Sequence, residues 1–142
     1  MNYLTRLLFI VLFFFLSIGK SYASDDLKNY LLKFMDTKNY PYHLLNDEYH
    51  AYVKSEGFPP MYFNKRNLRK MMEEQNTLIS NFEVINLTIL NSFDTEFFTS
   101  VIFECDYKFN IGNTNFNVKS FFHTIMEKTE TGWIVIFDAQ SQ

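Results

Sequence analysis

The stretch that decides the fold is the end of the chain, Ile125-Met-Glu-Lys-Thr-Glu-Thr-Gly-Trp-Ile-Val-Ile-Phe-Asp-Ala-Gln-Ser-Gln142. It contains an apolar run, a short polar turn around Thr129 to Gly132 and a second apolar run. Strict alternation divides the second run into two faces: Trp133, Val135 and Phe137 on one, Ile134, Ile136 and Asp138 on the other. The pattern predicts a hairpin, so the chain ends inside a sheet.

Earlier in the chain, three runs have the period of two that β-strands require, and the last of them contains the first apolar run above. They cover residues 79–90, 97–109 and 115–128, and Gly112-Asn113 is a hairpin turn signal between the last two. The middle run predicts one buried face, made of Phe97, Thr99, Val101, Phe103, Cys105, Tyr107 and Phe109. Polar residues on its other face are typical of an antiparallel sheet that is half exposed.

Helical periodicity precedes the strands. Apolar residues recur at steps of three and four over residues 27–35, where Ser24 or Asp25 can cap the helix. A helical turn is expected at residues 40–45, a strand at 48–54 and a helix from the cap Asn64 to Gln75. The sequence therefore predicts an α+β protein, with N-terminal helices packed on a curved antiparallel β-sheet.

The first 23 residues read as a secretory signal peptide. Arg6 precedes a twelve-residue apolar run, Leu7 to Ile18, and the small residues Ser21 and Ala23 suit signal peptidase. An uncleaved membrane anchor is the alternative, although twelve residues are short of the ~20 that span a bilayer. We expect cleavage near Ala23/Ser24, a single domain over residues 24–142, a secreted or periplasmic location, and membrane contact only during export.

Composition excludes some function classes for residues 24–142. They carry 11 basic and 16 acidic side chains, a formal charge of −5, because residues 1–23 contain Arg6 and Lys20 and no acid. Nucleic-acid binding is not expected, since phosphates require concentrated positive charge. The lone Cys105 cannot form an internal disulfide, and we expect a buried, inert thiol.

The order of these elements resembles the nuclear transport factor 2-like superfamily, also called SnoaL-like, with its cone-shaped α+β fold. The best motif is Thr124 to Lys128 followed by Thr131-Gly132-Trp133-Ile134-Val135, which is similar to the family's apolar strand, charged turn and Gly-Trp pattern. The resemblance covers nearly all of residues 24–142. Because the superfamily includes enzymes, carriers and interaction modules, the motif says little about function.

The resemblance implies a conical pocket between helices and sheet. An isomerase of this kind would have a carboxylate base near Tyr52 and an acidic donor near Thr124, and neither position holds a carboxylate. His50 and Tyr52, which share a strand face, are the remaining catalytic candidates. The ligand-binding candidates are Tyr30, Phe34, His50, Tyr52, Phe103 and Thr124. Three His residues without matched spacing predict no metal site, and no cofactor is expected.

Three functions remain open at this point. The leading hypothesis is a non-catalytic binding module whose pocket takes an apolar small molecule or whose wide end takes a protein partner. The second is a small lyase or isomerase that uses His50 and Tyr52. The third is an accessory component of a bacterial secretion system, some of whose bridge proteins share the fold. Pairing of the open sheet predicts a homodimer.

Overall fold

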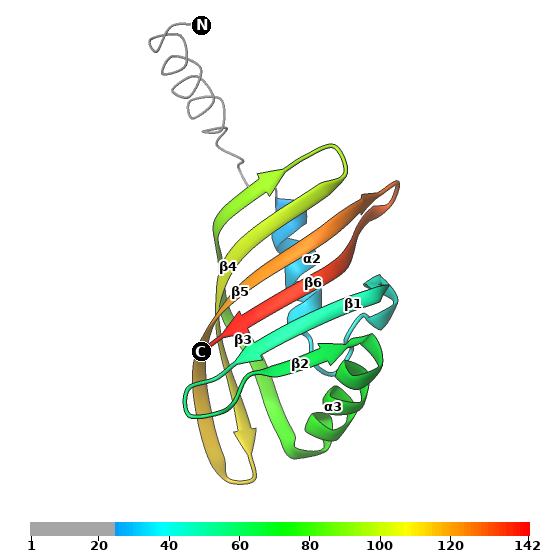
Figure 1. The fold of residues 1–142 in the computed structure, drawn as a ribbon. Coiled ribbons are helices and arrows are strands. Elements are labelled where there is room, and N and C mark those ends of the chain that lie inside the picture. The colour runs from blue at the N-terminus through cyan, green and yellow to red at the C-terminus, as the bar shows by residue number, and fades with distance from the viewer. Residues whose placement is uncertain (1–24) are drawn as a thin grey trace, which may run out of the picture.

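The computed structural model describes residues 25–142 (Figure 1). The predicted signal peptide, its cleavage site and the candidate cap Ser24 lie outside these residues. Among the residues described, no helix is both long and apolar enough to span a membrane.

One six-stranded sheet forms the body of the molecule, in the order β2-β1-β6-β5-β4-β3. Its strands are β1 (Leu45–Lys54), β2 (Met61–Asn64), β3 (Ile79–Asp94), β4 (Phe98–Ile111), β5 (Thr114–Thr129) and β6 (Gly132–Ser141). Hairpins join β3 to β6 as an antiparallel meander, as the sequence predicted. The exception to the antiparallel prediction is β1, which pairs parallel with β6 because it fills the free edge that the meander leaves.

Within residues 25–142, two α-helices and one helical turn complete the fold. α2 (Asp25–Met35) crosses behind the sheet in Figure 1 and buries Leu27, Tyr30, Leu31 and Met35. η1 (Tyr42–Leu44) is the short turn expected after Pro41. α3 (Lys65–Leu78) begins at the predicted cap, where the Asn64 side chain accepts a hydrogen bond from the Asn67 N–H at 2.9 Å. This is the α+β cone expected from the sequence.

The observed strands differ most from the predicted ranges in three places. No strand was predicted between Lys54 and Asn64, and the structure has the four-residue edge strand β2 there, after the loop that contains Gly57, Pro59 and Pro60. β1 begins at Leu45 rather than Glu48, and β3 continues to Asp94 rather than ending at Leu90. In each place, pairing with a neighbouring strand extends the sheet beyond the residues whose alternation predicted it.

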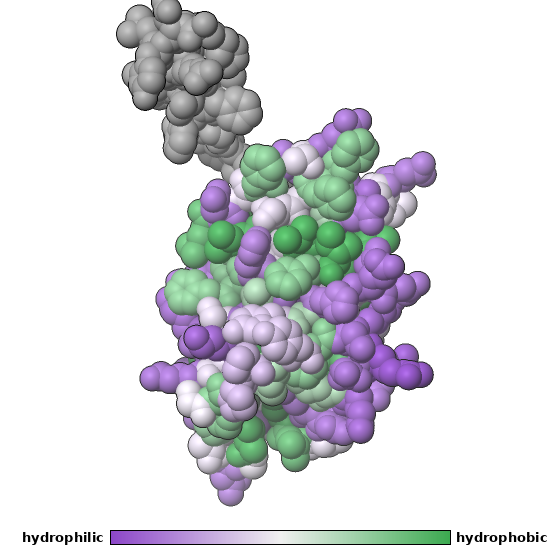
Figure 2. Space-filling model, in the orientation of Figure 1, coloured by the Kyte–Doolittle hydropathy of each residue, from purple (hydrophilic) through white to green (hydrophobic). Residues whose placement is uncertain are grey.

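The sheet has an inner face that packs on the helices and an outer face. Alternation in β4 buries Thr99, Val101, Phe103, Cys105 and Tyr107 on the inner face, as predicted, whereas Phe97 lies before the strand and is exposed. The outer face keeps apolar groups among polar ones, as Figure 2 shows over the central strands. Phe98, Ile102 and Phe121 are each 40–44% exposed there.

A β-bulge changes the alternation in the last strand. Met126 of β5 pairs with Val135, and the preceding Ile125 pairs with Phe137, so Ile136 is one residue extra in β6. Because side chains alternate, an extra residue moves everything after it to the opposite face. Val135 is fully buried on the inner face, and Asp138 also points inward, against the prediction from strict alternation.

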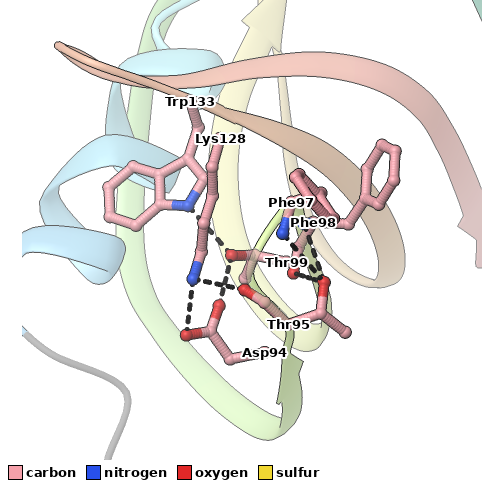
Figure 3. A network of polar contacts seen from close by, with 7 residues as sticks. All are labelled: Asp94, Thr95, Phe97, Phe98, Thr99, Lys128 and Trp133. Carbon is pink, nitrogen blue, oxygen red and sulfur yellow. Dashed lines mark hydrogen bonds and ion pairs between the residues drawn. The ribbon is translucent and has the colours of Figure 1, made fainter.

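Polar contacts hold Trp133 of the fold-deciding hairpin against the end of β3 and the start of β4 (Figure 3). Its indole Nε1 donates to Thr99 Oγ1 at 3.0 Å, and that hydroxyl donates to Asp94 Oδ1 at 2.7 Å. Lys128 Nζ completes the network at 2.8 Å from Asp94 Oδ2. On its other side the ring of Trp133 lies 5.2 Å from the ring of Tyr30. The hairpin of β5 and β6 therefore joins α2 to β3 and β4.

Candidate functional site

A cavity of ≈ 470 Å³ lies between the inner face of the sheet and the two α-helices. Its wall is mostly apolar and aromatic, with Leu31, Phe34, Met72, Phe82, Phe103 and Phe122 among the lining residues. Met61, Gln75, Phe116 and Gln142 line it and are also exposed, so they mark its mouth. The size and lining are those of a small-molecule site.

A carboxyl group lies inside this apolar cavity. Asp138 of β6 is half-buried, and it lines the cavity. Tyr49 Oη donates to Asp138 Oδ2 at 3.1 Å, and Thr124 Oγ1 donates to Oδ1. The sheet sets this arrangement, because Asp138 is paired with Thr124 on β5 and with Ala51 on β1.

Burial changes the acidity of this group. Removal from water raises the pKa of Asp138 to about 6, and the hydrogen bonds from Thr124 and Tyr49 offset only part of that effect. Burial, and after it the negative charge of Asp138, raises the pKa of Tyr49 and of Tyr40 above the usual range. Both phenols are therefore neutral donors at physiological pH.

A second polar group lies further along the same strand face. Gln140 Nε2 donates to Ser120 Oγ at 3.2 Å, and the hydroxyls of Ser120 and Tyr107 lie 3.0 Å apart. Gln142 Nε2 donates to Tyr107 Oη at 3.1 Å. Since Asp138 and Gln140 are two residues apart on a strand, the cavity has two polar positions roughly 7 Å apart on one wall.

The residues proposed from the sequence are distributed unevenly around the cavity. Phe34, Tyr52, Phe103 and Thr124 line it, and Phe103 stacks on Phe122 with ring centroids 4.9 Å apart. Tyr30 lines a different hollow, and its hydroxyl donates to the Trp133 carbonyl. Four of the six candidates from the sequence therefore line the cavity, and Tyr30 does not.

His50 is exposed and is absent from the cavity lining. Its strand neighbours Tyr49 and Ala51 are buried and line the cavity, so His50 lies on the other face of β1. The ring of Tyr52 lies 5.1 Å from that of Tyr62 on β2. The cavity brings Tyr49, rather than His50, next to a carboxyl group.

Neither Asp138 nor Tyr49 is among the site residues proposed from the sequence. Neither of the expected positions, Tyr52 and Thr124, holds a carboxylate, but cross-strand pairing brings Asp138 to the side of Thr124. The sequence did contain a signal, because Asp138 directly follows the apolar residues 133–137 of the last strand. A carboxylate is costly to bury without partners, so an acid in such a strand indicates a polar site. Strict alternation assigned that acid to the wrong face because the bulge at Ile136 was not visible.

A second, more open hollow of ≈ 680 Å³ lies between α2, η1 and the β5–β6 turn. Lys33, Asp36, Asn39 and His43 are among its lining residues. The Asp36 carboxylate is already engaged, because it accepts from the backbone N–H groups of Lys38 and Asn39 at 3.1 and 3.2 Å. The less open cavity around Asp138 is therefore the candidate functional site.

No protein-family model and no curated protein sequence matches the chain. Solved structures, in contrast, resemble the chain in fold. A ketosteroid isomerase-like protein from Erwinia carotovora atroseptica aligns with a TM-score of 0.61 at 10% identity, over 85% of this chain and 96% of the other. A candidate dehydratase of the NTF2-like family from Streptomyces avermitilis has a TM-score of 0.62 at 10% identity, over 82% and 94% of the two chains. A conserved protein from Planctomyces limnophilus gives 0.62 at 14% identity, over 82% and 92%.

Proposed function

The chain has the nuclear transport factor 2-like fold, and we propose that it uses the cavity of that fold to bind a small, largely apolar molecule without transforming it. The observation that carries the proposal is the cavity itself. Aromatic residues line it without filling it, leaving ≈ 470 Å³ of space beside a few polar groups. A pocket that existed only for packing would be closed by its side chains, because voids in protein cores are unfavourable.

The hydrogen bonding of Asp138 favours binding over catalysis. An isomerase requires a free neutral donor that stabilises the oxyanion as the carboxylate removes a proton. Here the hydroxyls of Thr124 and Tyr49 both donate to the carboxylate itself. They hold Asp138 in place, and they are not free to stabilise charge on a substrate.

A neutral fluorescent probe tests the proposal directly. We expect N-phenylnaphthylamine to bind the purified protein with one-to-one stoichiometry and increased fluorescence. Val118 lines the cavity, so Val118→Phe should weaken binding at least tenfold by filling space. The matched control is Ile102→Phe, which adds a ring to the outer face, where Ile102 is 40% exposed. Equal binding by both variants and the unchanged protein would reject the cavity as the site.

A lyase or isomerase is the second candidate, and one observation favours it: a carboxyl group with a pKa of about 6 in an apolar cavity is suited to exchange protons at neutral pH. This candidate uses Asp138 with Tyr40 as the donor, because no His is among the lining residues. Deuterium exchange into the α-carbons of a panel of cyclic ketones, followed by NMR, would detect it. Exchange that Asp138→Asn abolishes would replace the binding proposal with this one.

Export and self-association complete the proposal. The signal-peptide pattern in residues 1–23 supports action outside the cytoplasm, and sequencing the N-terminus of the protein from its host tests it. The apolar groups on the outer face support a homodimer or another protein partner. Native mass spectrometry of the same preparation would detect a dimer, a bound partner or a bound small molecule.

A further inference from the structure

The absence of positive charge from the cavity lining sets the class of ligand. We propose that the cavity selects a compact apolar molecule that carries one protonated amine, and that the ammonium group pairs with Asp138. This inference rests on the proposed binding function and adds the charge of the ligand. It depends on which groups surround the carboxylate and on which are missing.

The residues that line the cavity include one acidic side chain and no basic one. Asp138 is the only Asp or Glu among the residues that line the cavity, and none of them is Lys, Arg or His. Within residues 25–142, no ion pair is found for Asp138, although Asp47 and Asp94 each pair with a lysine. Buried charges in proteins are normally paired. A cationic ligand would supply the missing countercharge, and an anionic ligand would add repulsion.

The polar groups that interact with Asp138 come from four parts of the chain and are all neutral. Thr124 comes from β5, Tyr49 from β1, Tyr40 from the segment before η1 and Tyr30 from α2. Two of these groups donate hydrogen bonds, which orient the carboxylate but leave its charge in place. The phenol rings of Tyr40 and Tyr49 also suit an ammonium group, because aromatic faces attract cations.

The raised pKa of Asp138 gives the site a defined pH dependence. The carboxylate form, which attracts an ammonium group, dominates above pH 6, and the neutral acid dominates below. If only the ionised form pairs with the amine, the affinity is proportional to the fraction of protein in which Asp138 is ionised. The affinity for the amine should therefore fall about 30-fold from pH 7.5 to pH 4.5. A neutral ligand should show little change over the same range.

Three probes that share a naphthyl ring and a two-carbon chain separate the possibilities: naphthylethylamine, naphthylethanol and the carboxylate of naphthaleneacetic acid (the acetate). Each is titrated by isothermal calorimetry at pH 7.5 and at pH 4.5. We expect the amine to bind at least tenfold tighter than the alcohol at pH 7.5, the acetate to bind weakest, and the preference for the amine to disappear at pH 4.5. Asp138→Asn should remove the preference and keep the alcohol's affinity. Asp26→Asn, which removes a charge from the exposed side of α2, should change neither.

The outcomes distinguish the two proposals. If the alcohol or the acetate binds as tightly as the amine at pH 7.5, the amine inference is wrong and the apolar binding function stands. If none of the three probes binds, the binding function fails and the inference fails with it. The pH series on the unchanged protein gives the same decision without a mutation, so it does not depend on the stability of Asp138→Asn.

Discussion

Replacing Asp138 with Asn should stabilise the protein more at pH 7.5 than at pH 4.5. The amide has nearly the shape of the carboxyl group, so the cavity wall keeps its packing. What changes is the ability to ionise. The folded protein holds Asp138 at a pKa of about 6, whereas the ordinary value is 3.8. Between these values the native state binds a proton that the unfolded chain has released.

The sign and size follow from that difference. Since the native state binds more protons in this window, the free energy of unfolding falls as pH rises through it. At about 1.36 kcal/mol for each pH unit, the full interval between 3.8 and about 6 corresponds to about 3 kcal/mol. The part that falls between pH 4.5 and 7.5 is about 2 kcal/mol. Between pH 4.5 and pH 7.5, the wild-type protein should therefore lose about 2 kcal/mol of its free energy of unfolding relative to Asp138→Asn.

Urea denaturation followed by circular dichroism, at both pH values and without ligand, measures the difference. Other carboxyl groups also titrate, among them Asp36, Asp47 and Asp94, whose partners lower their pKa values. They are present in both proteins and cancel. The altered hydrogen bonds to Thr124 and Tyr49 shift the stability by an amount that is the same at both pH values.

Asp26→Asn is the matched control, because it removes a carboxyl group from an exposed position of α2. A stability difference between the wild type and Asp138→Asn that is the same at pH 4.5 and 7.5 would refute the reasoning. It would mean that water in the cavity solvates the carboxylate as well as bulk water does. The amine selectivity inferred for the cavity would then lose its pH dependence too.

Three further predictions concern other parts of the fold. Thr99→Val removes the acceptor of the Trp133 indole and should cost about 1–3 kcal/mol in urea denaturation, whereas Thr99→Ser keeps the hydroxyl and should cost about 1 kcal/mol; equal losses would dismiss the hydrogen bond. Burial, and next the charge of Asp106, raises the pKa of Cys105 to about 11, so Ellman's reagent should modify the native thiol at least about 100-fold more slowly than the unfolded one, and fast native labelling would contradict the buried position. Asn64→Ala should destabilise the protein by about 1 kcal/mol through loss of the α3 cap, and Asn64→Asp should retain that stability.

The fold was largely predictable because its signals are local and repeated. Helical spacing of apolar residues located α2, and Asn64 marked the start of α3. The period of two located the long strands, and Gly112, with φ of +57°, forms the turn expected between β4 and β5. The short strand β2 was missed because four residues carry too weak a pattern. Its position depends on pairing with β1.

The site was only partly predictable, because pairing between distant strands creates it. Sequence alone determined the α+β cone, and it pointed to Phe34, Phe103 and Thr124, which line the cavity. Tertiary structure decided which carboxylate enters the cavity. The extra residue at Ile136 reverses the alternation of β6 after Val135, and the register then sets Asp138 beside Thr124. A bulge arises from the pairing of two strands, so neither strand's sequence contains it.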